Sequence, residues 1–258
     1  MTGDPIREAY DENASFWTHI IQNKLDRYYV ELTQGDLLSE IGNCKGLSIL
    51  DAGCGEGNLA RILSGQNKNT HIYGIDNCLP LIETARRHNQ HEKDRVSFYH
   101  ADVKELPLAN SSIDLVIANR LPNAIDEPAQ RFLEFARVLR PGGRLILMSQ
   151  HPCFYAGRSE ADGRRSQIDV REYFSGRTVA RRFSVAGIES PAPSVQKIYS
   201  LEAYCSMITD AGFAITKIRE PHPSDSQLKD PWWKSNFKRP MFLLVTAILL
   251  PVEKRDVD

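Results

Sequence analysis

The stretch Leu50–Gly57 reads Leu-Asp-Ala-Gly-Cys-Gly-Glu-Gly and directly follows a short apolar run. Its three glycines at alternate positions let the backbone turn sharply after a strand and approach a ligand closely, because no Cβ atom intrudes. A glycine loop alone also fits an ordinary strand-to-helix turn. However, a second acidic residue, Asp76, ends the next apolar run, where a carboxylate faces ribose hydroxyls in nucleotide-binding folds. The pair predicts a site for a nucleoside cofactor.

Short apolar runs alternate with helical patterns along most of the chain. This alternation indicates an α/β fold with a mainly parallel sheet covered by helices on both faces, because parallel strands need a crossover connection. The expected strands are Leu47–Asp51, His71–Asp76, Val96–His100, Ile113–Asn119, Arg144–Ser149, Ala214–Glu220 and Met241–Leu249, and the expected helices are Asn58–Leu63, Leu79–His91, Ala129–Leu139 and Leu201–Ala211.

Two segments depart from this alternation. Residues 11–42 show helical spacing, and residues 151–199 hold many arginines and a predicted hairpin in which Arg171–Phe174 pairs with Arg177–Phe183. We therefore expect one domain over residues 1–258. Its parts are an N-terminal helical cap (1–46), a cofactor-binding core (47–150), a substrate lid inserted after the fifth strand (151–199) and the C-terminal end of the sheet (200–258).

Composition narrows the class of protein. The 258 residues are 41% hydrophobic and carry a net charge of −1, which suits one globular domain and favours a small-molecule partner over nucleic acid. Five cysteines without any Cys-x-x-Cys spacing fit a reducing compartment, and no zinc or other metal is implied. The longest apolar run, Met241–Leu250, is too short for a membrane span, so a cytoplasmic location without a membrane partner is expected.

Four motifs together resemble those of the class I, seven-strand methyltransferases that depend on S-adenosylmethionine. They are the glycine loop Leu50–Gly57, the acid Asp76, the segment Ala101-Asp102-Val103, and the Leu-x-Pro-Gly-Gly turn of Leu139–Gly143. The resemblance runs from about Tyr10 to Leu249. It implies a Rossmann-like fold, S-adenosyl-L-methionine as cofactor with S-adenosyl-L-homocysteine as product, and transfer of a methyl group to an oxygen, nitrogen or carbon atom of a small metabolite, as in natural-product tailoring.

The resemblance also implies roles for individual residues. The glycine loop would pass beneath the methionine part of the cofactor, Asp76 would bind the ribose, and Asp102 with the amide of Val103 would meet the adenine. Asp102 is equally suited to cap a helix, and Asn119 to end a strand. The full set of expected cofactor-binding residues is Asp51, Gly53, Cys54, Gly55, Gly57, Asp76, Asn77, Asp102, Val103 and Asn119.

Two residues are candidates for a part in the reaction itself. Tyr10 opens a Tyr-Asp-x-x-Ala segment that folds over the cofactor in many family members, and it would close the site; the alternative is a packed tyrosine at the start of a helix. His151 directly follows the fifth strand, where an imidazole with a pKa near neutrality could act as general base; the alternative is a histidine bonded to backbone in a turn.

Three questions stay open in the sequence. The arginines of residues 151–199, together with Tyr173, Phe174 and Phe183, suit either an anionic acceptor or RNA, or form a solvated surface. An RNA methyltransferase that uses these arginines is therefore one alternative to a small-molecule enzyme. A regulatory protein that binds the cofactor without turnover is the other. Trp232-Trp233 suits an aromatic pocket wall or core packing, and a monomer and a homodimer are equally compatible with the sequence.

Overall fold

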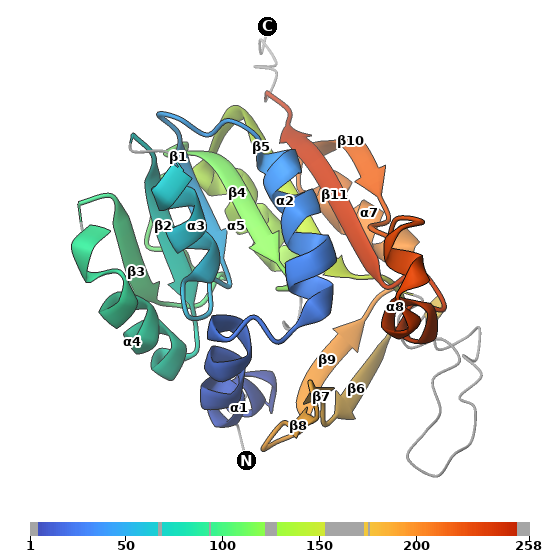
Figure 1. Cartoon of the computed structure of the whole chain (residues 1–258). Coiled ribbons are helices and arrows are strands. Elements are labelled where there is room, and N and C mark those ends of the chain that lie inside the picture. The colour runs from blue at the N-terminus through green and yellow to red at the C-terminus, as the bar shows by residue number, and fades with distance from the viewer. Residues whose placement is uncertain are drawn as a thin grey trace, which may run out of the picture.

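The computed structural model describes residues 5–66, 69–92, 94–121, 128–152, 173–174 and 176–251. Its centre is a seven-stranded sheet with the order β10-β11-β5-β4-β1-β2-β3 (Figure 1). All neighbouring pairs are parallel except those of β11, which runs antiparallel to both β10 and β5. The strands are β1 (Ser48–Ala52), β2 (His71–Asp76), β3 (Val96–His100), β4 (Ile113–Asn119), β5 (Leu139–Gln150), β10 (Phe213–Arg219) and β11 (Phe242–Leu249). The predicted fold class is confirmed.

Helices cover both faces of this sheet, as the alternating pattern predicts. Buried apolar side chains of α2, α3 and α4 pack against one face, and those of α5 and α7 pack against the other (Figure 1). The two resulting apolar layers explain why the central strands are apolar on both sides. The helices are α2 (Gln34–Ile41), α3 (Asn58–Gln66), α4 (Leu79–His88), α5 (Pro128–Val138), α7 (Leu201–Asp210) and α8 (Pro231–Asn236).

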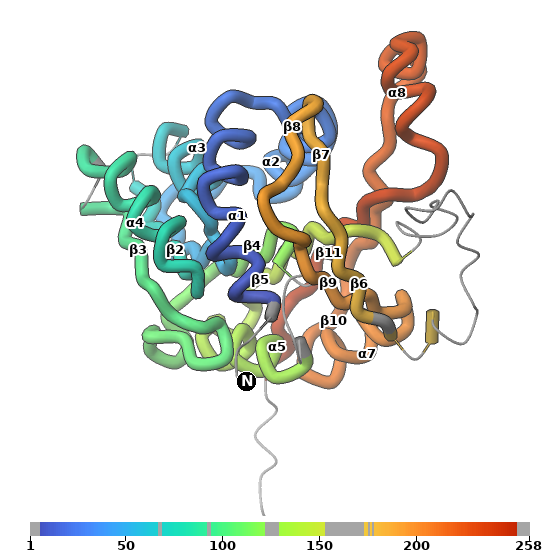
Figure 2. Tube along the Cα trace, turned by 90° about the horizontal axis from the view of Figure 1, so that it is seen from below, coloured from blue at the N-terminus to red at the C-terminus, as the bar shows by residue number. Residues whose placement is uncertain are grey.

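The N-terminal part is helical, as expected. It comprises α1 (Pro5–Gln22) and a short π-helical turn, η1 (Tyr29–Thr33), which leads into α2. Figure 2 shows α1 beside the β-hairpin of residues 177–198, away from the sheet's outer strands. None of the helices in the described ranges is long and apolar enough to cross a membrane.

The fifth strand differs from its prediction. The expected strand began at Arg144 after a Pro-Gly-Gly turn, whereas β5 already begins at Leu139, which pairs with Ile113. The next pair joins Leu115 to Arg144, so residues 140–143 bulge out of the ladder. Proline tolerates this position because a bulged residue needs no ladder hydrogen bond from its nitrogen.

The prediction for the hairpin named the wrong partner strand. β6 (Arg177–Arg181) pairs with β9 (Ser194–Ile198), and not with Tyr173 and Phe174. Tyr173 and Phe174 are helical, and residues 171–172 lie outside the described residues. The tip of the observed hairpin is formed by β7 (Ser184–Val185) and β8 (Ile188–Glu189) around Ala186-Gly187. Both tip residues have positive φ, 51° and 80°, which is what a two-residue hairpin turn requires.

Candidate functional site

A cavity of about 1000 Å³ opens where β1, β2 and β4 end. Asp51, Asp76 and Asn119 line it from these three strands. Because the strands are parallel and adjacent, their carboxyl ends meet at one edge of the sheet, which is where ligands bind in open α/β folds. Residues far apart in sequence therefore come together at this edge.

The glycine loop forms the floor of the cavity. Gly53 and Gly55 line it with φ values of 72° and 56°, a left-handed conformation that side chains rarely adopt. A Cβ atom on Gly53 would lie 2.8 Å from Leu121 Cδ1. Gly57 also has positive φ, but it does not line the cavity, because it packs against Phe98. Of the three predicted glycines, two therefore line the cavity.

Asp76 holds the glycine loop in place. Its Oδ2 accepts a hydrogen bond from the Gly55 amide at 2.9 Å, and its Oδ1 accepts one from the Cys78 amide, also at 2.9 Å. A carboxylate oxygen has two acceptor sites, so each oxygen retains one for a ligand donor. Burial raises the pKa of Asp76, and the backbone hydrogen bonds oppose that shift.

Asp51 is a second buried acid of the site whose pKa is raised. Burial, with a smaller contribution from the nearby Asp76 charge, raises its pKa to about 7. Its Oδ2 is buried and has no hydrogen-bond partner among the described residues. A buried carboxylate without a donor is costly, so Asp51 is suited to receive a cation or a hydrogen-bond donor from a ligand.

The remaining predicted cofactor residues also line the cavity. Asp102 lines the cavity and accepts a hydrogen bond from the Lys104 amide at 2.8 Å, so it caps a turn and not a helix, and its role toward an adenine stays a prediction. Asn119 Oδ1 is buried without a partner within the described part of the chain. Cys54 lines the cavity with a buried thiol, which stays neutral because burial raises its pKa. Asn77 and Val103 complete the set.

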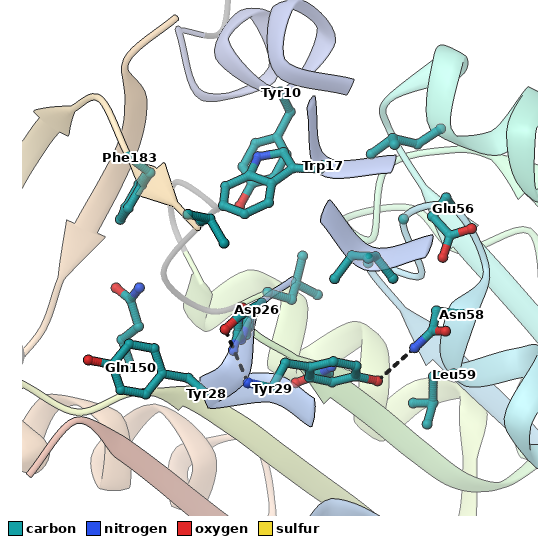
Figure 3. A pocket seen from close by; sticks show the side chains of 18 of the residues that line it. Tyr10, Trp17, Asp26, Tyr28, Tyr29, Glu56, Asn58, Leu59, Gln150 and Phe183 are labelled. Atoms are coloured by element: carbon teal, nitrogen blue, oxygen red, sulfur yellow. Dashed lines mark hydrogen bonds and ion pairs between the residues drawn. The ribbon is translucent and has the colours of Figure 1, made fainter. Parts of the chain in front are cut away.

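A roof closes the cavity from above. It consists of α1, which contributes Tyr10 and Trp17, and of the β-hairpin, which contributes Phe183 from the segment between β6 and β7 (Figure 3). The two parts are fastened together by Asn13, whose side chain donates to the Ala192 carbonyl and accepts from the Ala192 amide, both at 3.0 Å. The structure thus places Tyr10 over the cavity, as expected for a residue that closes the site.

A second end of the cavity lies away from the glycine loop. Tyr28 lines it on the side opposite Tyr10 and Trp17, and Tyr29 lies between Tyr28 and Asn58, the residue that follows the glycine loop (Figure 3). Asn58 donates a hydrogen bond to the Tyr29 hydroxyl at 2.9 Å, and burial raises the pKa of Tyr29 to about 12. Tyr29 is therefore a neutral phenol that offers its proton as a donor and cannot serve as a base near neutral pH.

The structure does not bring His151 together with the other predicted residues. Gln150 lines the cavity, but His151 does not, since neighbouring residues of an extended segment point to opposite sides. The His151 Nε2 atom lies 3.0 Å from Glu220 Oε1, and the amide donates to the Met241 carbonyl. Burial lowers the pKa of His151 more than Glu220 raises it. A role as general base stays a prediction.

Sequence reasoning missed several lining residues of the second end. They are Trp17, Asp26, Tyr29, Arg120 and Gln150. Only Arg120 carried a signal, because it directly follows the expected strand end at Asn119. Of the two neighbouring tryptophans, Trp232 lines the cavity and Trp233 is buried in the core, so each of the two interpretations holds for one of them. In the described ranges, no three His, Cys, Asp or Glu side chains group as a metal site would need.

The chain is similar in sequence to known methyltransferases. Residues 43–168 match the family model described as a methyltransferase domain. A malonyl-[acyl-carrier protein] O-methyltransferase of Hahella chejuensis is 40% identical over 98 residues, which is 38% of this chain and 34% of that enzyme. A 2-phytyl-1,4-naphtoquinone methyltransferase of Thermosynechococcus vestitus is 24% identical over 217 residues, covering 83% of this chain and 88% of that enzyme.

A solved structure agrees over most of the chain. The S-adenosylmethionine dependent methyltransferase from Mesorhizobium loti superposes with a TM-score of 0.66 at 25% identity, covering 83% of this chain and 96% of that one. The chain spans less than two thirds of several curated relatives, including 56% of a 37.1 kDa protein of transposon TN4556 from Streptomyces fradiae and 34% of the Hahella enzyme.

Proposed function

We propose that this chain transfers a methyl group to an oxygen, nitrogen or carbon atom of a small metabolite. Through its methyltransferase domain it belongs to the class I S-adenosylmethionine-dependent methyltransferases. The observation that carries the proposal is the single cavity that joins the glycine loop to a second end under one roof. Its volume of about 1000 Å³ lies at the upper end of small-molecule pockets. That space suits a cofactor and a small acceptor side by side.

The residues at the glycine-loop end fit this cofactor. Asp51 has a buried oxygen that no described residue bonds as a donor, which suits the ammonium of the methionine part. Asp76 retains one acceptor site on each oxygen, which suits the two ribose hydroxyls. Asp102 and Val103 line the cavity where an adenine would lie if the family's arrangement applies. Gly53 and Gly55 leave room for the ligand above them.

The protein's contribution to catalysis is alignment and exclusion of water. When bound, S-adenosylmethionine would supply a methyl group activated by its positively charged sulfur, and that sulfur would leave as a neutral thioether when the acceptor atom attacks the methyl carbon in line. Tyr10 and Trp17 close the cavity from above, and the Asn13 hydrogen bonds hold this roof to the hairpin. Holding two reactants in line supplies much of the rate. An amine acceptor loses its proton to solvent after the transfer, whereas a hydroxyl acceptor needs a base that removes its proton during the transfer.

The proposal is tested by two measurements on the full chain. Calorimetric titration with S-adenosylmethionine and S-adenosylhomocysteine should show binding of one molecule per chain. Incubation with S-adenosylmethionine labelled in the methyl group, together with a fractionated cell extract, should then place label in the small-molecule fraction. Label in the RNA fraction would instead support the nucleic-acid alternative, and cofactor binding without transfer to either fraction would support a regulatory protein.

The raised pKa of Asp51 predicts that cofactor binding releases a proton below pH 7. A cation beside the carboxylate favours its charged form, so binding must remove the proton that Asp51 holds when its pKa is about 7. The affinity should therefore fall by up to about tenfold per pH unit as the pH drops below 7. Calorimetry at pH 6 in two buffers of different ionisation enthalpy measures the released proton.

The variant Asp51→Asn separates this effect from that of Asp76, whose pKa is also raised. In the variant, the proton released at pH 6 should largely disappear, and binding above pH 7 should weaken because the ammonium loses its charged partner. An unchanged proton release in Asp51→Asn would assign the titration to Asp76 and contradict the prediction.

A further inference from the structure

The two ends of the cavity carry opposite charge. Three acids that line the cavity stand at or just after the ends of β1, β2 and β3, beside the glycine loop, and the bases that line it lie on the segment after α1, just after β4 and on the hairpin. Glu56 adds no free charge, because Arg61 pairs with both of its carboxylate oxygens at 2.7 and 2.8 Å. The acids of the first end are Asp51, Asp76 and Asp102, and the charged residues of the second end are Lys24, Arg27, Arg120, Arg181 and Arg182 with the single acid Asp26.

Two of these five bases are already neutralised. Arg120 pairs with Asp26 at 2.7 Å, and Arg27 pairs with Glu31 and Asp230, both at 2.6 Å. These pairs fasten the segment before α2 to the end of β4 and to α8, so they have a structural task. The charges on Arg27 and Arg120 are therefore not available as the main attraction for a ligand.

The other three bases have no carboxylate partner within the described residues. Lys24 follows α1, and Arg181 and Arg182 lie at the end of β6, so the bases come from both parts of the roof. The Arg182 Nη1 atom donates to the Ser190 carbonyl at 3.1 Å, which leaves the guanidinium charge uncompensated. All three side chains are exposed at the cavity. Three like charges at one mouth repel one another, and an anion placed there would relieve this repulsion.

We call Lys24, Arg181 and Arg182 the cationic rim. Aromatic side chains line the cavity as well. The Trp17 and Phe183 rings lie 6.0 Å apart on the roof, and Tyr28 lies on the opposite side (Figure 3). The Tyr28 ring lies 5.0 Å from the Trp232 ring. The indole N–H of Trp17 is a buried donor without an acceptor among the described residues, and so is the Nε–H of Arg120. Trp17 and Arg120 thus offer donors here, whereas Asp51 and Asn119 supply acceptors without a partner among the described residues.

We infer that the methyl acceptor is a small aromatic molecule that carries an anionic oxygen group, a carboxylate or a phosphate. Its ring would pack between the aromatic walls, and its anionic group would bind the rim of Lys24, Arg181 and Arg182. Rim and walls together select for charge and shape, because a charged group without an apolar body would gain little from the walls. The inference rests on the proposed function and adds the acceptor's chemical class to it.

The test uses two fluorescent probes that differ only in charge. 1-Anilinonaphthalene-8-sulfonate has an aromatic body with an anionic group, and N-phenyl-1-naphthylamine is the same body without that group. Both are titrated into the full chain saturated with S-adenosylhomocysteine at neutral pH. We expect the anionic probe to bind one site with an affinity about tenfold or more above that of the neutral probe. Competition by 1-naphthoate and by 1-naphthyl phosphate then distinguishes a carboxylate from a phosphate.

Charge variants assign the preference to the rim. The variant R181A/R182A should remove most of the advantage of the anionic probe and leave the affinity of the neutral probe within about twofold. A matched control, K45A/R87A, removes the same charge from two exposed residues that do not line the cavity, and it should leave both affinities unchanged. Trp17→Leu should weaken both probes, since it removes the wall and not the charge.

The outcomes separate this inference from the proposed function. Equal affinity of the two probes, or an advantage that persists in R181A/R182A, overturns the inference even when S-adenosylhomocysteine binds. Failure of S-adenosylhomocysteine to bind overturns the proposed function by itself, and the probe comparison is then repeated on the chain without it. Loss of the anionic preference in K45A/R87A would show that the net charge of the protein is the cause, and it would also overturn the assignment to the rim.

Discussion

Replacing Asp76 by alanine is expected to weaken the binding of S-adenosylmethionine at least about 100-fold. Hydrogen bonds to a charged group are worth about 1.5–3 kcal/mol each, and the carboxylate has one open acceptor site on each oxygen. The variant also removes the acceptor of the Gly55 amide at 2.9 Å, so the glycine loop loses a tether at the same time. Calorimetric titration of the variant and the unchanged protein measures the effect.

Two further variants define the cause of the Asp76 effect. Asp225→Ala removes an equal charge from an exposed position outside the cavity, and it should leave the affinity unchanged. Asp76→Asn keeps one oxygen as acceptor and should bind with intermediate affinity. If Asp76→Ala bound S-adenosylmethionine within threefold of the unchanged protein, the assignment of this residue to the ribose would have to be abandoned.

Replacing Gly74 by alanine is expected to lower the free energy of unfolding by about 1–3 kcal/mol, the usual cost of overpacking a core. A Cβ atom there would lie 2.5 Å from Phe98 Cδ1 and 2.6 Å from Phe98 Cε1, and 3.0 Å from Cys54 Sγ. Phe98 cannot simply move aside, because its ring also fills the space against Gly57. The displaced ring should therefore disturb the glycine loop as well, and cofactor affinity should fall with stability.

Denaturant unfolding with two companion variants tests the steric explanation. Phe98→Leu removes the ring edge, so adding it to Gly74→Ala should recover part of the lost stability relative to the sum of the single variants. Gly65→Ala is the matched control, because Gly65 lies in α3 with open space around its Cα atom and ordinary φ. It should raise stability by about 0.5–1 kcal/mol. A Gly74→Ala variant as stable as the control would contradict the packing seen around Phe98.

Much of the sheet was predictable from the sequence. The predicted limits of His71–Asp76, Val96–His100 and Ile113–Asn119 agree with β2, β3 and β4. Each of these strands holds buried apolar residues and is bounded by turn residues, so its ends are determined by local chemistry. The acids and glycines of the cofactor end belong to the loops at these strand ends. Parallel strands bring such loops to one edge, and nine of the ten residues expected at the cofactor line the cavity there.

The arrangement of side chains at the second end of the cavity depends on the tertiary structure. The hairpin of residues 177–198 pairs strands that are separated by a turn at Ala186-Gly187, and its roof position depends on the Asn13 hydrogen bonds to Ala192. The same holds for His151, which turns toward Glu220 while its neighbour Gln150 faces the cavity. Periodicity and turn chemistry act between near neighbours, so the sequence by itself determined the strands and the cofactor loop. Which side chains face each other across the cavity depends on packing between distant segments, and only the folded chain shows it.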